Sequence, residues 1–329
     1  MDNSSLPTYA PISYHVGVEH LASFNTATAR PWGQAAPGMG EPAPLHPVAG
    51  MDDVPPAAPT FAAVVAQRAA AVLIADPQLG IDFSRVLHGS ESIELHEPIR
   101  AGDQLTVLPG VKRVVERGPL RTLASRTEVH GPRGLAAVVE STLAVMPPAQ
   151  PAPAAAAAAL QPADAAPAQP GGAPAEAAQT AAAQAVQETE ANLAQWSLVP
   201  PTLEPAEVEG ADFAYRVRLT LTDLVRYAGA SRDFNPIHHN PAVAKAAGLP
   251  GVIAHGMLTL ALVASSLEAH AGLGKVRQLR ANFSGMVVVD PVRGAELTIS
   301  GQRGEDGKVT LSVTCAGRDV LARASALLA

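Results

Sequence analysis

Segment 255–270, HGMLTLALVASSLEAH, limits the possible folds of this chain more than any other stretch. Its apolar residues would cover nearly every side of a helix, and such a helix is stable only when other elements enclose it. Four strand-like runs follow, separated by short turn signals as in an antiparallel meander. They cover residues 276–289, 295–302, 308–317 and 320–329. The C-terminal part is therefore predicted to be an α+β unit in which a sheet wraps around one long helix.

The N-terminal part repeats this order of elements. A short helix is predicted around Val18–Thr28. It corresponds to a helix predicted to start at Thr220, because Thr220 and Asp223 have the spacing of a capping box. A second helix, rich in small apolar residues, is predicted at 59–76 and corresponds to the enclosed helix of the C-terminal part. Strand-like runs follow it at 85–97, 104–116, 120–131 and 135–146. The chain is therefore predicted to contain two copies of one α+β fold.

The stretch between the two parts is predicted to be a linker. From Pro147 to Gln179 it contains neither lysine nor arginine and consists largely of alanine and proline. Such a segment cannot bury enough apolar surface to offset the entropy lost on ordering. We expect it to be disordered or partly extended, and the alanines, glutamines and glutamates at its end favour a short helix. The predicted domains are residues 1–146 and 196–329, with the linker at 147–195.

Charge and composition exclude several classes of partner. The formal net charge is −7 and no long Lys/Arg run is present, so neither a nucleic acid nor an anionic membrane surface is expected. The first residues lack the features of a signal peptide, and no apolar run approaches the roughly 20 residues that cross a bilayer. Cys315 is the only cysteine, which excludes an internal disulfide. It lies in a strand-like run with no visible base nearby, so a buried, inert thiol is expected. We expect a cytoplasmic protein.

Two stretches of the C-terminal part carry polar residues in a spacing that suggests chemistry. Residues 231–241 read SRDFNPIHHNP, and HGML follows at 255–258. Together they resemble the MaoC-like, or hydratase 2, branch of the hot-dog fold. The family motif D-x-N-P-[LIV]-H matches Asp233, Asn235, Pro236, Ile237 and His238. Residues 86–105, VLHGSESIELHEPIRAGDQL, also resemble the N-terminal half of these dehydratases.

The resemblance implies a fold and an activity. The expected fold is an α+β double hot-dog, with two antiparallel sheets that each wrap around a long buried helix. The expected activity is that of a hydro-lyase, the reversible dehydration of (3R)-3-hydroxyacyl thioesters to trans-2-enoyl thioesters in fatty-acid or related acyl metabolism. Coenzyme A or acyl carrier protein would carry the acyl group, so phosphopantetheine enters only as the substrate's carrier. We also expect a homodimer.

The implied reaction needs proton transfer and stabilisation of charge on the thioester oxygen. Asp233 and His238 are the catalytic candidates, because a turn containing Pro236 can aim both side chains into one pocket and histidine exchanges protons near neutral pH. Gly256 is the candidate oxyanion site, because the N–H groups at a helix start attract negative charge and glycine lets a carbonyl come close. Loop support or substrate contact is expected from Asn235, Pro236, His255 and Met257.

Other interpretations stay open beside the chemical one. Asp233 and Asn235 are common turn residues, and Asn235 could serve only to hold the loop. His239 is interpreted as structural, since neighbouring side chains in an irregular loop rarely converge on one atom. His255 is interpreted as shaping the turn before Gly256. No His/Cys set with zinc spacing, phosphate loop or dinucleotide motif is present in the sequence, so no metal or cofactor is expected.

Two alternative functions also stay open. One is a binding protein for acyl thioesters that has lost the chemistry, and the other is a hydratase for branched or dicarboxylic enoyl-CoA. The N-terminal part lacks the D-x-N-P-x-H motif after its first helix, and its second helix opens on Pro59, Thr60 and Phe61. We therefore predict one active site per chain, in the C-terminal part.

Overall fold

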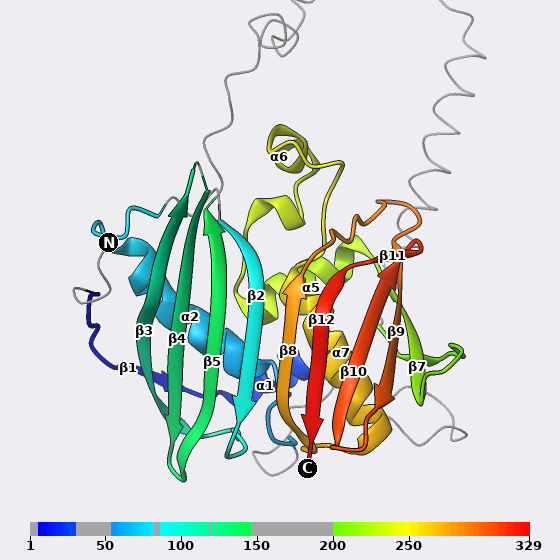
Figure 1. Ribbon diagram of the computed structural model, residues 1–329, viewed down its shortest axis with the longest axis horizontal. Coiled ribbons are helices and arrows are strands. Elements are labelled where there is room, and N and C mark those ends of the chain that lie inside the picture. The colour runs from blue at the N-terminus through cyan, green and yellow to red at the C-terminus, as the bar shows by residue number, and fades with distance from the viewer. Residues whose placement is uncertain (1–5, 31–53, 82–85, 119, 146–199) are drawn as a thin grey trace, which may run out of the picture.

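The structure is a computed structural model that describes residues 6–30, 54–81, 86–118, 120–145 and 200–329. The predicted linker and the helix at its end lie outside the described residues and stay predictions. Figure 1 shows two similar halves side by side, each with a curved sheet in front of its long helix. Among the described residues, no helix is both long enough and apolar enough to cross a membrane.

The N-terminal half contains every helix and strand predicted for it, in the predicted order. An additional short strand, β1 (Ile12–His15), precedes the helices α1 (Val18–Ala27) and α2 (Phe61–Ala75). The longer strands are β2 (Val86–Leu95), β3 (Gln104–Arg117), β4 (Leu120–Gly131) and β5 (Gly134–Val145). Helix α2 packs against β3, β4 and β5. The predicted wrapping of a sheet around this helix is therefore confirmed.

The C-terminal half repeats the arrangement. Its helices are α5 (Leu221–Ser231) and α7 (Gly256–Ala271), with the 3-10 turn η5 (Pro236–His238) and the short helix α6 (Pro241–Ala246) between them. Its strands are β6 (Glu204–Pro205), β7 (Phe213–Leu219), β8 (Val276–Phe283), β9 (Ala295–Arg303), β10 (Lys308–Cys315), β11 (Arg318–Asp319) and β12 (Leu321–Leu328). The predicted capping box is present, with Thr220 accepting from the Asp223 N–H and Asp223 accepting from the Thr220 N–H at 2.9 Å.

The strand order corrects the predicted meander. The order is β1-β3-β4-β5-β2-β8-β12-β10-β9-β7-β6, with β11 paired to β10. Strand β8 pairs with β12 and not with β9, and β2 pairs with β5 and not with β3. In each half, the strand that follows the long helix lies at the inner edge of the sheet. The meander prediction was wrong because turn signals mark where a strand ends and not which edge the next strand occupies.

The two inner strands pair with each other. Strands β2 and β8 are antiparallel, with Ser92 opposite Arg280 and Ile93 opposite Leu279. The two sheets expected from the sequence are therefore continuous in one twelve-stranded sheet. Pairing these strands removes two exposed sheet edges, which would otherwise attract other chains. The α+β double hot-dog fold is confirmed, and its halves are joined by backbone hydrogen bonds.

Helix α7 is enclosed as its sequence requires. Leu258, Leu260 and Leu267 are fully buried, and they belong to one core cluster that includes residues of both halves. The polar residue Ser265 is also buried, and its hydroxyl donates to the Thr28 carbonyl oxygen of the N-terminal half at 2.7 Å. The two halves therefore share one core.

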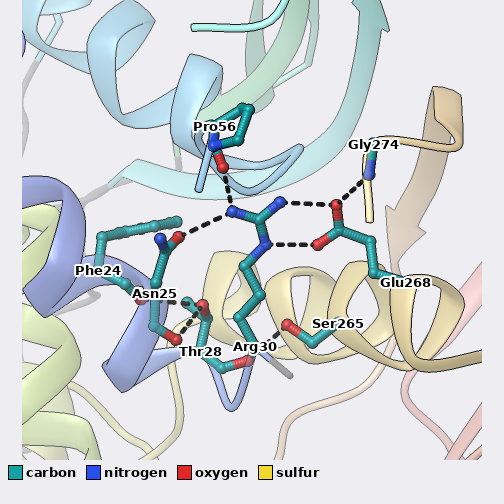
Figure 2. Close-up of polar contacts among 8 residues, drawn as sticks. All are labelled: Phe24, Asn25, Thr28, Arg30, Pro56, Ser265, Glu268 and Gly274. Carbon is teal, nitrogen blue, oxygen red and sulfur yellow. Dashed lines mark hydrogen bonds and ion pairs between the residues drawn. The ribbon is translucent and has the colours of Figure 1, made fainter. Parts of the chain in front are cut away.

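A buried ion pair joins the halves near the C-terminal end of α7 (Figure 2). Nε and Nη2 of Arg30 donate to the two carboxylate oxygens of Glu268 at 2.6 and 2.8 Å, and each side chain is 1% exposed. The remaining Arg30 nitrogen donates to Asn25 and to the Pro56 carbonyl oxygen, while the Gly274 N–H donates to Glu268 at 3.1 Å. These partners compensate for the removal of both charges from water.

The cysteine is less buried than predicted. Cys315 is half-buried and lies at the end of β10, where the described residues that pair with it belong to the short strand β11 and to β9. Burial nevertheless raises the pKa of its thiol. A thiol that stays protonated at neutral pH reacts slowly, so the structure agrees with an inert cysteine.

Replacing Arg30 with Met should lower the free energy of unfolding by about 3–5 kcal/mol, because Glu268 would stay buried without its partner. The double variant Arg30→Met/Glu268→Met removes both charges and should recover most of this loss. Urea denaturation measures both effects. The control is Arg121→Met, which breaks the more exposed pair with Glu116 and should cost no more than about 1 kcal/mol. A stable single variant would show that the buried pair contributes nothing.

Candidate active site

The loop between α5 and α6 is shaped by hydrogen bonds from its own side chains. Asp233 Oδ1 accepts from the Asn235 N–H at 3.2 Å, and Asn235 Oδ1 accepts from the Ile237 N–H at 3.3 Å. Pro236 begins η5, and this single 3-10 turn ends at His238. The turn roles considered for Asp233 and Asn235 are therefore present. These turn roles are compatible with a catalytic role of the loop, because the same hydrogen bonds determine where His238 lies.

Two further hydrogen bonds attach this loop to the segment before α7. Nδ1 of His238 lies 2.8 Å from the Ile253 carbonyl oxygen, and Nε2 of His255 lies 3.1 Å from the Asp233 carbonyl oxygen. Each imidazole thus bonds the backbone of the other segment. The two sequence stretches that carry the family motif are joined directly.

As a result, three titratable side chains gather at one place. An oxygen of Asp233 and ring nitrogens of His238 and His255 all lie within 4.8 Å of one another. The two imidazoles stack, with centroids 3.8 Å apart and planes 27° apart. Both histidines are buried and Asp233 is half-buried. The structure brings Asp233 and His238 together as predicted, and it adds His255, which keeps its predicted role in the turn.

The hydrogen bonds determine which ring nitrogens carry hydrogen. A carbonyl oxygen only accepts, so Nδ1 of His238 and Nε2 of His255 are the donors. The lone pairs of neutral rings then lie on Nε2 of His238 and on Nδ1 of His255, and the latter has no partner among the described residues. Burial lowers the pKa of His238, and burial together with the His238 charge lowers the pKa of His255 to about 3. Both rings are neutral at neutral pH, and Nε2 of His238 can accept a proton.

The same three side chains do not have the arrangement of a metal centre. Imidazole nitrogens bind zinc at about 2.0–2.1 Å along the ring plane. The two rings are stacked, with centroids 3.8 Å apart and planes 27° apart, so an ion in the plane of one ring would lie out of the plane of the other. The geometry therefore favours proton transfer over metal binding at this site.

The start of α7 keeps free hydrogen-bond donors. His255 is the N-cap residue, but no side chain caps this end, and the Gly256 N–H has no backbone partner among the described residues. Phe283 of β8 packs here, since a Cβ atom on Gly256 would lie 2.9 Å from the Phe283 ring. Glycine is therefore needed for the close approach of Phe283, a role that the sequence did not reveal. The free N–H groups can still attract a negative charge.

The other predicted residues lie around the site in different ways. His239 and Pro236 are exposed, and the structure separates His239 from its buried neighbour, as predicted. Met257 is 5% exposed and belongs to the hydrophobic core. Met257 therefore packs beneath the helix start, and its expected contact with substrate stays a prediction.

Two side chains near the cluster were not predicted. The Tyr227 ring lies 5.0 Å from the His255 ring, and its buried hydroxyl has no partner among the described residues. Burial, followed by the charges of nearby carboxylates, raises the pKa of Tyr227. One of these carboxylates is Glu91, on β2 of the N-terminal half. The sequence did contain a signal for the burial of Glu91. Alternate residues of a strand share one face, and Glu91 lies two residues before the apolar Ile93, which is fully buried.

The N-terminal half builds the same turn from different residues. In both halves the first helix is followed by a left-handed residue, after a hydroxyl side chain that donates to the carbonyl oxygen four residues earlier. The hydroxyl residues are Thr28 and Ser231, and the left-handed residues are Ala29 and Arg232. The next residue is Arg30 in the N-terminal half and Asp233 in the C-terminal half. A cation thus stands where the other half has its carboxylate.

The start of α2 also differs from the start of α7. The Phe61 N–H donates to the Ala58 carbonyl oxygen at 2.9 Å, so the donor that corresponds to the Gly256 N–H is already used. A cavity of about 250 Å³ adjoins Arg30 and Glu268, and the described residues that line it include no histidine. At these corresponding positions, the described residues of the N-terminal half therefore offer neither the Asp–His pair nor the free donor.

Family models match both halves of the chain. Residues 204–317 match the model of the MaoC like domain, and residues 7–139 match a FAS1-like, dehydratase domain region. A UPF0336 protein from Streptomyces coelicolor is 35% identical over 130 residues, which are 40% of this chain and 81% of that protein. The 3-hydroxyacyl-thioester dehydratase X of Mycobacterium tuberculosis is 51% identical over 53 residues, which are 16% of this chain and 19% of that protein.

Solved structures show the same fold over nearly the whole chain. A MaoC-like dehydratase has 22% identity and a TM-score of 0.68, and the match covers 97% of this chain and 96% of that one. HtdX of Mycobacterium tuberculosis has 18% identity and a TM-score of 0.59, with 96% and 98% covered. At these identities the similarity establishes the fold and not the substrate.

The neutral histidines predict a loss of stability in acid. The unfolded chain binds protons at histidine below an ordinary pKa of about 6.5, whereas folded His255 stays neutral until its pKa of about 3. Stability is therefore full above about pH 6.5 and falls as the pH decreases toward the folded pKa. Between about pH 6.5 and pH 5, His255 alone should lower the free energy of unfolding by about 1.5 kcal/mol.

Urea denaturation of the wild type and of His255→Gln over this pH range checks this prediction. The glutamine amide can still donate to the Asp233 carbonyl oxygen, but it cannot titrate. The variant should therefore show a shallower decrease than the wild type. Equal slopes would contradict a neutral His255 in the folded state.

Proposed function

This chain belongs to the MaoC-like dehydratases, and we propose that it catalyses the reversible dehydration of (3R)-3-hydroxyacyl thioesters to trans-2-enoyl thioesters. The observation that carries the proposal is the convergence of Asp233 and His238 beside the uncapped start of α7. An acid–base pair and an oxyanion donor are the two functions that this reaction needs. Coenzyme A or acyl carrier protein would carry the acyl group.

Asp233 and His238 supply the proton transfer. In the hydration direction, Nε2 of His238 accepts a proton from a water molecule held between the imidazole and the Asp233 carboxylate. The water oxygen bonds to C3, the C2–C3 double bond becomes a single bond, and the acid–base pair returns the proton taken from water to C2. Dehydration reverses these steps, so the C2 proton is removed and the C3 hydroxyl leaves as water. A neutral imidazole with a free Nε2 suits this exchange, because it can both accept and return the proton.

The start of α7 supplies the electrostatic stabilisation. Removal of the C2 proton places negative charge on the thioester oxygen, and the Gly256 N–H is proposed to donate to that oxygen. A helix N-terminus also carries a partial positive charge. Because these groups are already oriented in the folded protein, they stabilise the transition state without reorganisation.

The chemistry is assigned to the C-terminal half alone. Arg30 occupies the position of Asp233 in the N-terminal half, and it is held by Glu268. The Phe61 N–H is satisfied by Ala58. These two differences between the halves support one active site per chain.

Hydration of crotonyl-CoA, followed as loss of enoyl absorbance, tests the proposal. Asp233→Asn and His238→Ala should each lower kcat on the order of 10²–10⁴, the usual loss for a proton-transfer group. Asp233→Asn keeps an oxygen for the bond from Asn235, so the loop should stay folded. His239→Ala is the matched control, because this adjacent histidine is exposed, and it should keep nearly full activity. Equal losses at His238 and His239 would contradict the assignment.

Gly256→Ala should lower kcat/KM, because the added methyl group would lie 2.9 Å from the Phe283 ring and displace the helix start. The loss should approach the roughly 10²–10³ typical for one oxyanion donor. Gly229→Ala is the control, since a Cβ atom there meets no atom within 4 Å. A crystal structure with a bound enoyl or hydroxyacyl thioester checks the contact itself. The carbonyl oxygen should lie within about 3.2 Å of the Gly256 nitrogen, and a carbonyl directed elsewhere would remove this oxyanion site.

A further inference from the structure

Glu91 is a buried carboxylate that the proposed reaction does not use. It lies on β2 of the N-terminal half, at the strand that pairs with the C-terminal half, and its side chain is 1% exposed. A charged group is retained in such a place only when it has strong partners. Oε2 of Glu91 lies 2.7 Å from Nε2 of His88. Glu91 and His88 therefore form a largely buried carboxylate–imidazole pair.

The backbone of β2 is altered so that this pair can form. In a regular strand, residues three positions apart face opposite sides of the sheet. The register between β2 and β5 shifts between His88 and Ser90, which marks a β-bulge that brings His88 to the side of Glu91. The residue between them, Gly89, lies close to the backbone of β5, since a Cβ atom on it would lie 3.2 Å from the Thr142 carbonyl oxygen. Bulges commonly re-aim a side chain next to an active site.

Contacts lead from this pair to the proposed oxyanion donor. The His88 ring centroid lies 4.9 Å from that of Phe283. The Phe283 ring lies against Gly256, close enough to exclude a Cβ atom there. Strands β2 and β8 pair at this point, with Ser90 opposite Asn282. A continuous series of contacts thus crosses the boundary between the halves, from Glu91 through His88 and Phe283 to Gly256.

Tyr227 packs on the acid–base cluster and also responds to Glu91. The Glu91 charge reaches Tyr227, whose pKa is raised first by burial and then by Asp233 and Glu91. The Tyr227 ring contacts His255, which stacks on His238. The packing contacts that carry the inference are those from Glu91 through His88 and Phe283 to the helix start.

We propose that Glu91 and His88 are positioning residues, contributed by the N-terminal half, for the active site of the C-terminal half; this rests on the function proposed above. The carboxylate fixes the His88 imidazole, and the imidazole packs against Phe283. The Phe283 ring then holds the start of α7 and determines from which side a thioester carbonyl reaches the Gly256 N–H. Neither Glu91 nor His88 touches the reacting atoms.

The test compares two variants that remove the carboxylate. Glu91→Leu leaves His88 without its partner, and kcat for crotonyl-CoA should fall about tenfold while KM changes by less than about threefold, because an oxyanion donor acts mainly in the transition state. His88→Phe/Glu91→Leu keeps an aromatic ring against Phe283 and should restore kcat to within about threefold of the wild type. A purely structural role would lower the melting temperature and would not separate kcat from KM.

Glu94→Leu is the matched control for these variants. Glu94 lies on the same strand and also pairs with a histidine, His96 at 3.4 Å, but it is exposed. Its replacement should leave kcat and KM unchanged. Glu91→Leu with the kcat of the wild type would overturn the proposal, as would a loss that the double variant does not recover.

A crystal structure of Glu91→Leu gives a result that does not depend on turnover. The Phe283 ring should move away from Gly256, and an unmoved ring would overturn the proposal whatever the activity. If the wild type fails to hydrate any enoyl thioester, the proposed function fails. The position of Phe283 in the variant still decides whether Glu91 orders the helix start.

Discussion

The structure depends on the enclosure of α7. A helix with apolar residues on nearly every side cannot lie on a surface, and its own sheet covers only part of it. The N-terminal half supplies the remaining partners, including the Thr28 carbonyl oxygen for Ser265 and the Arg30 guanidinium for Glu268. Because these polar groups are buried at the boundary, the two halves fold around one core. The position of the start of α7 follows from the packing of both halves around this helix.

The halves share one backbone plan and differ in a few side chains. Both place a left-handed residue after the first helix, and both follow it with a charged residue. In one half this residue is Arg30, which a carboxylate of the other half neutralises. In the other half it is Asp233, which lies beside two neutral imidazoles. The same turn therefore serves as an inter-half clamp on one side and as the candidate acid–base site on the other.

Neutral histidines at this site follow from burial rather than from residue type. Each ring donates one hydrogen bond to a backbone carbonyl oxygen, and burial lowers the pKa of both. His238 retains a free Nε2 lone pair, while His255 holds the two segments together. The positioning role proposed for Glu91 would extend this division of labour, with a residue of the N-terminal half ordering the start of α7. Under the proposed function, contacts that pack the boundary would also orient the active site.

The sequence alone determined the elements of the fold and the motif. The apolar run at 255–270, the capping pair Thr220 and Asp223, and the spacing of Asp233 and His238 are local patterns, and local patterns survive without tertiary information. The pairing of β2 with β8, the stacking of His255 on His238, and the approach of Phe283 to Gly256 join residues far apart in the chain. No local spacing encodes such contacts. They depend on which edges and faces the packed halves bring together, and only the tertiary structure decided them.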